Sequence, residues 1–96
     1  MDFWSWGGKY IGSAYGDVLY SKTGKPIGHF LDNELYDFSG RYIGEKRNCN
    51  RLIVNKSCKH KLISIYSKPC NICGSSYCDY AGYAMLAGYE DFKYKE

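Results

Sequence analysis

Three cysteines near the C-terminus have the spacing that most directly suggests chemistry. Cys70 and Cys73 are separated by two residues and followed at once by a glycine, and Cys78 lies five residues further on. A Cys-x-x-Cys turn aims two thiolates at one point, and many zinc sites use this arrangement. Zinc takes four ligands in structural sites. We therefore expect a zinc site formed by Cys70, Cys73, Cys78 and Cys58, with His60 as the alternative fourth ligand.

Two other interpretations of these cysteines stay open. They could be reduced, half-buried side chains without a metal, or Cys70 and Cys73 could form a reactive dithiol. A redox pair of this kind usually opens a helix within a βαβ unit, and the sequence has no such pattern. The total of five cysteines is odd, which argues against a complete disulfide framework.

The N-terminus lacks the charged and apolar regions of a signal peptide. No apolar run in the sequence is long enough to cross a membrane. We therefore expect a cytoplasmic protein without a membrane partner, in a compartment where thiols stay reduced.

The middle of the chain is basic, although the net charge is only +3. Residues 41–68 carry eight Lys or Arg against one Glu, whereas both flanks are mildly acidic. Cations beside aromatic rings can bind phosphates and stack on bases, but cations on strands also protect sheet edges. Tyr and Arg are in addition favoured at protein interfaces. The binding residues that we expect are Arg41, Tyr42, Lys46, Arg47, Arg51, Lys59 and Lys61.

A five-residue phrase, repeated every 16 residues, must position these side chains. Gly-Lys-Tyr-Ile-Gly at 8–12 returns as Gly-Lys-Pro-Ile-Gly at 24–28 and as Gly-Arg-Tyr-Ile-Gly at 40–44. Short apolar runs alternate with Gly, Asp and Asn, which tolerate the positive φ that tight hairpins need. The sequence therefore predicts a mainly all-β fold of four pseudo-symmetric, two-stranded hairpin repeats of 16 residues.

The last glycine of each phrase needs its own explanation, because glycine inside a strand weakens it unless something packs closely over it. We expect an aromatic ring from a neighbouring strand to cover each glycine. The isoleucine before each glycine should then face a common core. The glycines are Gly12, Gly28 and Gly44, and the expected rings are those of Trp4, Tyr20 and Tyr36.

The fourth repeat is less regular than the other three. We place it at residues 57–68, where Ile-Tyr-Ser-Lys at 65–68 resembles Leu-Tyr-Ser-Lys at 19–22. The half-unit at residues 3–6 is expected to pair with it and close the ring, which removes exposed edges.

Beyond the repeats, the sequence predicts a C-terminal extension. We expect residues 1–68 to form the β-repeat domain and residues 69–96 to form a Cys-containing extension packed on it. Within the extension, a short helix is expected over 79–93, capped by Asp79. The apolar side of this helix would carry Met85, Leu86, Tyr89 and Phe92.

The repeated phrases resemble a known family. Gly-Lys-Tyr-Ile-Gly, Leu-Tyr-Ser-Lys-Thr-Gly-Lys-Pro-Ile-Gly and Leu-Tyr-Asp-Phe-Ser-Gly-Arg-Tyr-Ile-Gly are similar to the small bacterial domain called the four-fold β-flower. The resemblance covers residues 3–68 and is clearest over 8–44. It implies hairpin repeats about a pseudo-four-fold axis. It implies no activity, because none is established for that family.

No nucleophile elbow, phosphate-cradling loop or His-Glu-x-x-His motif is present in the sequence, so we expect no catalysis. We expect a small binding protein with Tyr-rich and basic surfaces and structural cysteines, whose partner is a protein rather than a nucleic acid. The alternatives are a nucleotide or small anion in an axial pocket of the closed ring, and nucleic-acid binding through residues 41–68. A further alternative is a phage or bacterial inhibitor of a host factor.

Overall fold

Short strands make up almost all of the regular structure. The computed structural model describes residues 1–94, and within them the fold is all-β, as the sequence predicted. These residues contain no helix long and apolar enough to span a membrane. The elements are β1 (Asp2–Ser5), β2 (Tyr10–Tyr15), β3 (Val18–Ser21), β4 (Pro26–Leu31), β5 (Glu34–Tyr36), β6 (Tyr42–Arg47), β7 (Arg51–Asn55), the 3-10 turn η1 (Lys56–Cys58) and β8 (Tyr89–Asp91).

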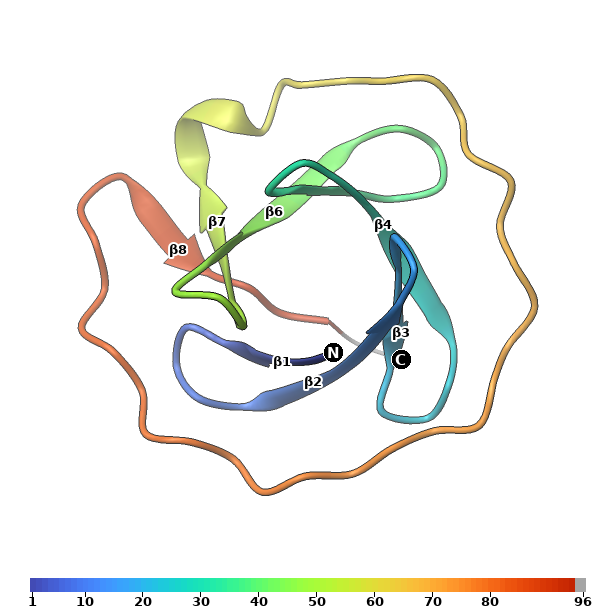
Figure 1. Ribbon diagram of the computed structural model, residues 1–96. Coiled ribbons are helices and arrows are strands. Elements are labelled where there is room, and N and C mark those ends of the chain that lie inside the picture. Colours follow the sequence, from blue (N-terminus) through green and yellow to red (C-terminus); the bar gives the residue numbers. More distant parts are fainter. Residues whose placement is uncertain (95–96) are drawn as a thin grey trace.

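Strands β1 to β7 form a closed barrel, seen along its axis in Figure 1. Neighbours pair antiparallel in chain order, and β1 pairs in parallel with β7, with Trp4 opposite Arg51. The same edge of β7 continues into an antiparallel pairing with β8, which lies outside the barrel. The N-terminal half-unit therefore closes the ring as expected, but its partner is β7 and not residues 57–68.

The three turns that open the repeated phrases are built alike. In each turn a glycine with positive φ donates its N–H to the carbonyl three residues earlier. The side chain of that earlier residue accepts the N–H of the residue after the glycine, which fixes the turn. The three sets are Ser5, Gly8 and Lys9; Ser21, Gly24 and Lys25; and Asp37, Gly40 and Arg41.

The last glycine of each phrase has a different role from the one expected. In each repeat the pairing shifts by one residue, so the isoleucine forms a β-bulge. Gly12 then lies opposite Phe3, and Trp4 pairs with Tyr10 instead. A side chain on Gly12 would collide with the backbone of the next strand. The expected cover by Trp4, Tyr20 and Tyr36 is therefore wrong. Gly12 and Gly28 allow strands to approach closely inside a narrow barrel, and Gly44 leaves room for the ring of Phe92.

One apolar core fills the barrel interior, as is usual for a barrel of this size. It includes Phe3, Ile11, Leu19, Ile27, Leu35 and Leu52. After β8 the chain turns toward the centre of the ring (Figure 1), and Phe92 joins the same core. Its ring would lie 2.9 Å from a Cβ added at Gly44. A ligand near the axis must therefore bind at a mouth of the barrel and not within it.

Residues 63–88 run round the outside of the barrel without regular structure (Figure 1), and we call them the belt. The belt passes the three turns in reverse chain order. Ile63, Ile72 and Tyr80 donate their N–H groups to the carbonyls of Gly40, Gly24 and Gly8, at 2.7, 2.8 and 2.7 Å. A Cβ on any of these glycines would collide with the carbonyl of the belt residue that it binds. The first glycine of each phrase therefore makes the turn and also seats the belt.

The belt replaces two expected elements. The helix expected over 79–93 is wrong: Tyr80 and Tyr83 donate their N–H groups to barrel carbonyls, and Met85 is exposed rather than buried on a helix face. Gly82 and Gly88 also have low helix propensity. The repeat expected at 57–68 is likewise wrong, because η1 and the start of the belt occupy that segment. The expected boundary between residues 68 and 69 falls within the belt.

The seating of the belt is tested by comparing two alanine substitutions. Gly24→Ala places a side chain at φ +91° against Ile72, whereas Gly16→Ala places one at φ +63° in open space. We expect Gly16→Ala to lower the free energy of unfolding by about 1 kcal/mol through backbone strain alone. Gly24→Ala should cost about 2–3 kcal/mol, because a belt hydrogen bond is lost as well. Urea denaturation measures both, and equal losses would contradict this role of the belt.

Candidate functional site

Among residues 1–94, the cysteines expected to bind zinc form no group of three whose ligand atoms lie within 4.8 Å of one another. Cys70, Cys73 and Cys78 are exposed on the belt, and Cys58 is half-buried at the end of η1. Near the Cys-x-x-Cys segment, Ile72 and Ser75 donate to barrel carbonyls, so the backbone follows the barrel surface. Zinc binding by these cysteines, with His60 as the alternative ligand, stays a prediction.

Within residues 1–94, one group of three potential metal ligands has its atoms within 4.8 Å of one another: Glu34, Glu45 and Cys58. Glu34 on β5 lies directly opposite Glu45 on β6. The equivalent pairs in the other repeats are Asp2 with Ser13, and Val18 with His29. Only the third repeat therefore sets two carboxylates face to face, an arrangement that costs stability unless a cation compensates.

Both carboxylates of this cluster have close partners. The Lys61 ammonium lies 2.6 Å from Glu34, and the Arg47 side chain lies 3.8 Å from Glu45. The Tyr36 hydroxyl donates to Glu34 at 3.0 Å, and the Tyr42 hydroxyl donates to Glu45 at 2.7 Å. Both glutamates are thus held in place by hydrogen bonds.

Burial and hydrogen bonds shift the pKa values of Glu34, Tyr36 and Tyr42. The hydrogen bond from Lys61 holds the pKa of the Glu34 carboxyl below its ordinary value. Burial, reinforced by Glu34, raises the pKa of the Tyr36 hydroxyl, and burial strongly raises the pKa of Tyr42. Both tyrosines therefore keep their hydroxyl protons, and remain hydrogen-bond donors, over the ordinary pH range.

Two carboxylates and a thiol could hold a divalent cation such as zinc, with Tyr36 and Tyr42 orienting the carboxylates and Lys61 displaced. The sequence pointed to Cys58 but not to Glu34 or Glu45. The available signal was that Glu45 shares its repeat position with Ser13 and His29. At this repeat position Ser13 contacts Ser75, His29 stacks on Tyr66 and Glu45 lies beside Cys58. All three side chains therefore lie beneath the part of the chain that follows β7.

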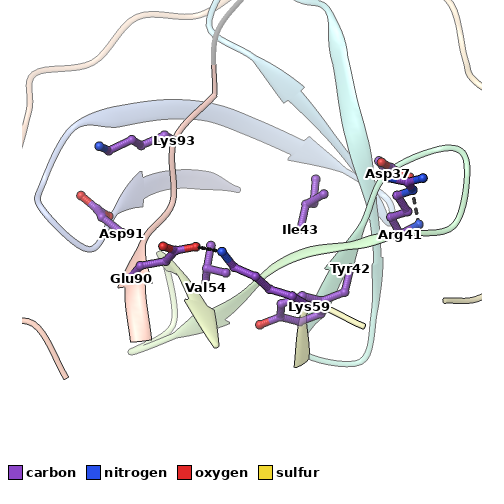
Figure 2. A pocket seen from close by; sticks show the side chains of 9 residues that line it. All are labelled: Asp37, Arg41, Tyr42, Ile43, Val54, Lys59, Glu90, Asp91 and Lys93. Carbon is purple, nitrogen blue, oxygen red and sulfur yellow. Dashed lines mark hydrogen bonds and ion pairs between the residues drawn. The ribbon is translucent and has the colours of Figure 1, made fainter. Parts of the chain in front are cut away.

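Two cavities flank the C-terminal segment, and both are lined by Asp91 and Lys93. The first, which we call the Arg41 cavity, has a volume of about 670 Å³. Figure 2 shows Asp37 and Arg41 on one side of it and Asp91 and Lys93 on the other, with the Lys59–Glu90 ion pair between them. The second, the Lys9 cavity, has a volume of about 630 Å³ and lies against the turns at Ser5–Lys9 and Lys22–Thr23.

Most of the basic residues expected to bind a partner have local partners of their own. Arg51 is buried, with its guanidinium 4.4 Å from the Tyr83 ring centre. The Lys46 ammonium lies 4.8 Å from the Phe30 ring centre. Tyr42 is buried, and Lys59 and Lys61 are paired with carboxylates. Arg47 contacts Glu45 and the Tyr89 ring. Arg41 is exposed and lines the Arg41 cavity.

The belt carries most of the large apolar side chains that are exposed. Six of the ten such residues within 1–94 lie on it: Ile65, Ile72, Tyr77, Tyr80, Tyr83 and Met85. Tyr80 stacks on Trp4 with ring centres 4.0 Å apart, and Tyr83 packs against Trp6 at 4.9 Å. We call Tyr77, Tyr80 and Tyr83 the tyrosine face. Tyr-rich surfaces were expected from the sequence, but the Tyr-x-x-Tyr-x-x-Tyr spacing over residues 77–83, the signal for this one, was missed.

The indole groups beneath the tyrosine face bind the belt backbone. Trp4 Nε1 donates to the Cys78 carbonyl at 2.9 Å, and Trp6 Nε1 donates to the Ala84 carbonyl at 2.8 Å. Buried tryptophans normally satisfy their N–H group in this way. The tyrosine face is therefore fixed from below by rings and by hydrogen bonds.

Comparison with known proteins identifies no relative of this chain. No protein-family model, no curated protein and no solved structure matches this chain. The resemblance to the four-fold β-flower family thus stays a prediction. Function has to be argued from the chemistry and geometry of the sites themselves.

The Lys61–Glu34 pair predicts a pH-dependent contribution to stability. Because the pKa of Glu34 is lowered in the fold, the pair stabilises the protein above the ordinary carboxyl pKa. This contribution is lost as the pH falls through the lowered value. We expect Lys61→Met to lower the thermal midpoint modestly near pH 7, where the Glu34–Glu45 repulsion is no longer compensated, and to have little effect at strongly acidic pH. Lys68→Met is the control, and an equal change in both variants would contradict the prediction.

Zinc binding is tested by removing one ligand from each candidate set. If zinc uses the Glu34–Glu45–Cys58 cluster, we expect Glu45→Gln to weaken binding by at least about tenfold and Cys73→Ser to leave it unchanged. Native mass spectrometry with and without chelator reads out the bound metal. The reverse result would place zinc at the belt cysteines, and an unshifted mass in the unmodified protein would exclude both sites.

Proposed function

We propose that this protein is a small non-catalytic binding protein whose partner is another protein, bound through the tyrosine face of the belt. The observation that carries the proposal is the concentration of exposed aromatic side chains on one long segment without regular structure. Loops of that length in a compact domain usually have a function or are disordered.

The contacts of the belt support a binding role. Ile63, Ile72 and Tyr80 are hydrogen-bonded to the turn glycines, and the two tryptophans bind the belt near the tyrosine face. A partner would therefore meet rings that are already positioned, so that little conformational entropy is lost on binding. Tyrosine also contributes a large contact area with few rotatable bonds.

The charges near the tyrosine face favour a protein partner over a nucleic acid. Arg51, the cation that contacts Tyr80 and Tyr83, is buried beneath the rings. The Asp79 carboxylate accepts the Tyr10 N–H at 2.8 Å, which places an acidic group in the same part of the belt. Nucleic-acid binding depends on cations that reach phosphates. An aromatic surface with buried cations suits the core of a protein interface better.

We also propose that the architecture is that of a four-petalled flower. Three hairpins, β1–β2, β3–β4 and β5–β6, project their turns toward the belt. The antiparallel pairing of β7 with β8 supplies a fourth pair of strands, whose connection is η1, the following residues and the belt. This arrangement supports the resemblance to the four-fold β-flower family.

The tyrosine face is tested by substitution of its exposed rings. Tyr77→Ala and Tyr80→Ala should each weaken partner binding by about tenfold or more, as expected for central interface aromatics. Leu31→Ala is the control, because Leu31 is 49% exposed, nearly the same as the 50% of Tyr80, and belongs to β4 and not to the tyrosine face.

The partner is first identified by quantitative affinity capture with the unmodified protein and is then purified for calorimetry. Binding that is unchanged in both tyrosine variants, or lost equally in Leu31→Ala, would contradict the proposal. Thermal unfolding of each variant checks that the fold is intact.

A further inference from the structure

We infer that the Lys9 cavity binds a small anion that carries an aromatic ring, with a mononucleotide as the class of ligand that fits. This site is separate from the tyrosine face and goes beyond the protein-binding function proposed above. Its volume of about 630 Å³ lies within the usual range for small-molecule sites. The lining that carries the argument is Ser5, Lys9, Ile11, Lys22, Phe92 and Lys93.

The cavity gathers cations from three separate parts of the chain. Lys9 follows the β1–β2 turn, Lys22 lies in the β3–β4 turn, and Lys93 follows β8. The ion pairs among residues 1–94 are Arg47–Glu45, Lys59–Glu90 and Lys61–Glu34, so none involves these lysines. Lys93 acts on Glu90 through its charge alone. Lysines that converge without forming ion pairs raise the local concentration of anions.

The one acidic residue in the lining does not neutralise the lysines fully. The Asp91 carboxylate accepts the Gly7 N–H with both oxygens, at 3.3 and 3.2 Å. This contact fixes the carboxylate on the β1–β2 turn. The lining therefore carries three positive charges against one negative charge, which leaves an excess of positive charge for an anion.

A buried hydroxyl adds a directed donor to the lining. Ser5 is only 2% exposed, and its oxygen accepts the Lys9 N–H at 3.1 Å. In the equivalent turn, the Ser21 hydroxyl is paired with the Thr23 hydroxyl at 3.1 Å. Glycine stands at the position equivalent to Thr23 in the first turn, and no described residue accepts the proton of the Ser5 hydroxyl. That proton is available to an anion in the cavity.

The apolar part of the lining favours a ligand with a ring over a bare inorganic anion. Ile11 and Phe92 both line the cavity and belong to the buried core. Small-molecule sites typically combine such an apolar surface with a few polar groups that fix orientation. A nucleoside phosphate offers both parts: a flat ring for Ile11 and Phe92, and phosphate oxygens for the lysines.

The Arg41 cavity is a weaker candidate for the same ligand. Its Lys59 is already paired with Glu90, and three acids balance its three cations. The repeat supplies a control residue for the Lys9 cavity. Lys25 is the repeat equivalent of Lys9 and is exposed, but it lines neither cavity.

The inference is tested by titrating ATP, adenosine and inorganic tripolyphosphate into the full-length protein by calorimetry. We expect ATP to bind more tightly than either fragment, because only ATP has both the ring and the phosphates. Lys9→Gln and Lys22→Gln should each weaken ATP binding by about tenfold, the usual value of a charge-assisted contact. Lys25→Gln should leave it unchanged.

No measurable ATP binding, or equal weakening by Lys25→Gln, would overturn the inference, because the latter indicates only general attraction to a positive protein. Adenosine binding as tight as ATP would also overturn it. Thermal unfolding confirms the fold of each variant, and backbone amide shifts near Ile11 and Phe92 locate the bound ATP in the cavity.

Discussion

The close approach of two backbones at three glycines is the constraint on which this structure depends. At Gly8, Gly24 and Gly40 the belt lies so near the turn that no side chain fits between them. At each contact the glycine has a positive φ, and its carbonyl accepts a backbone hydrogen bond from a belt residue that is distant in the sequence. The 16-residue spacing of the phrase thus sets the spacing of the belt contacts around the barrel. Glycine is the residue that meets both requirements at once.

Because the belt is fixed at these points, residues far apart in the sequence come together. Tyr80 reaches Trp4, and Tyr83 reaches Trp6 and Arg51. The chain that leaves the belt returns as β8 beside β7 and then sends Phe92 into the core. The returning segment also supplies Asp91 and Lys93 to the lining of both cavities. Both proposed binding surfaces therefore depend on the same path of the chain.

The sequence was informative where structure follows from local pattern. The repeated Gly-x-x-Ile-Gly phrase and its turn residues predicted the hairpins, since turn chemistry and strand alternation are local properties. The belt could not be predicted from local sequence pattern, because its hydrogen bonds go to turns that lie about 25 to 70 residues earlier in the chain. The helical spacing around Met85 predicted a helix wrongly for the same reason, since the nearby Tyr80 and Tyr83 N–H groups bond to distant barrel carbonyls. The Glu34–Glu45 cluster depends on strand register, which a one-residue bulge changes.

The way in which the belt is seated also constrains how the chain can fold. A glycine seat exists only once its turn has formed, because the positive φ and the aligned carbonyl are properties of the completed hairpin. Hairpin contacts span few residues and form quickly, whereas closing the segment between Asn55 and Tyr89 requires a much larger loop. The native belt contacts therefore follow the three hairpins in time. The tyrosine face, in which Tyr80 is hydrogen-bonded to Gly8, therefore forms after the β1–β2 hairpin, so a partner that binds this face binds a chain in which that hairpin is already complete.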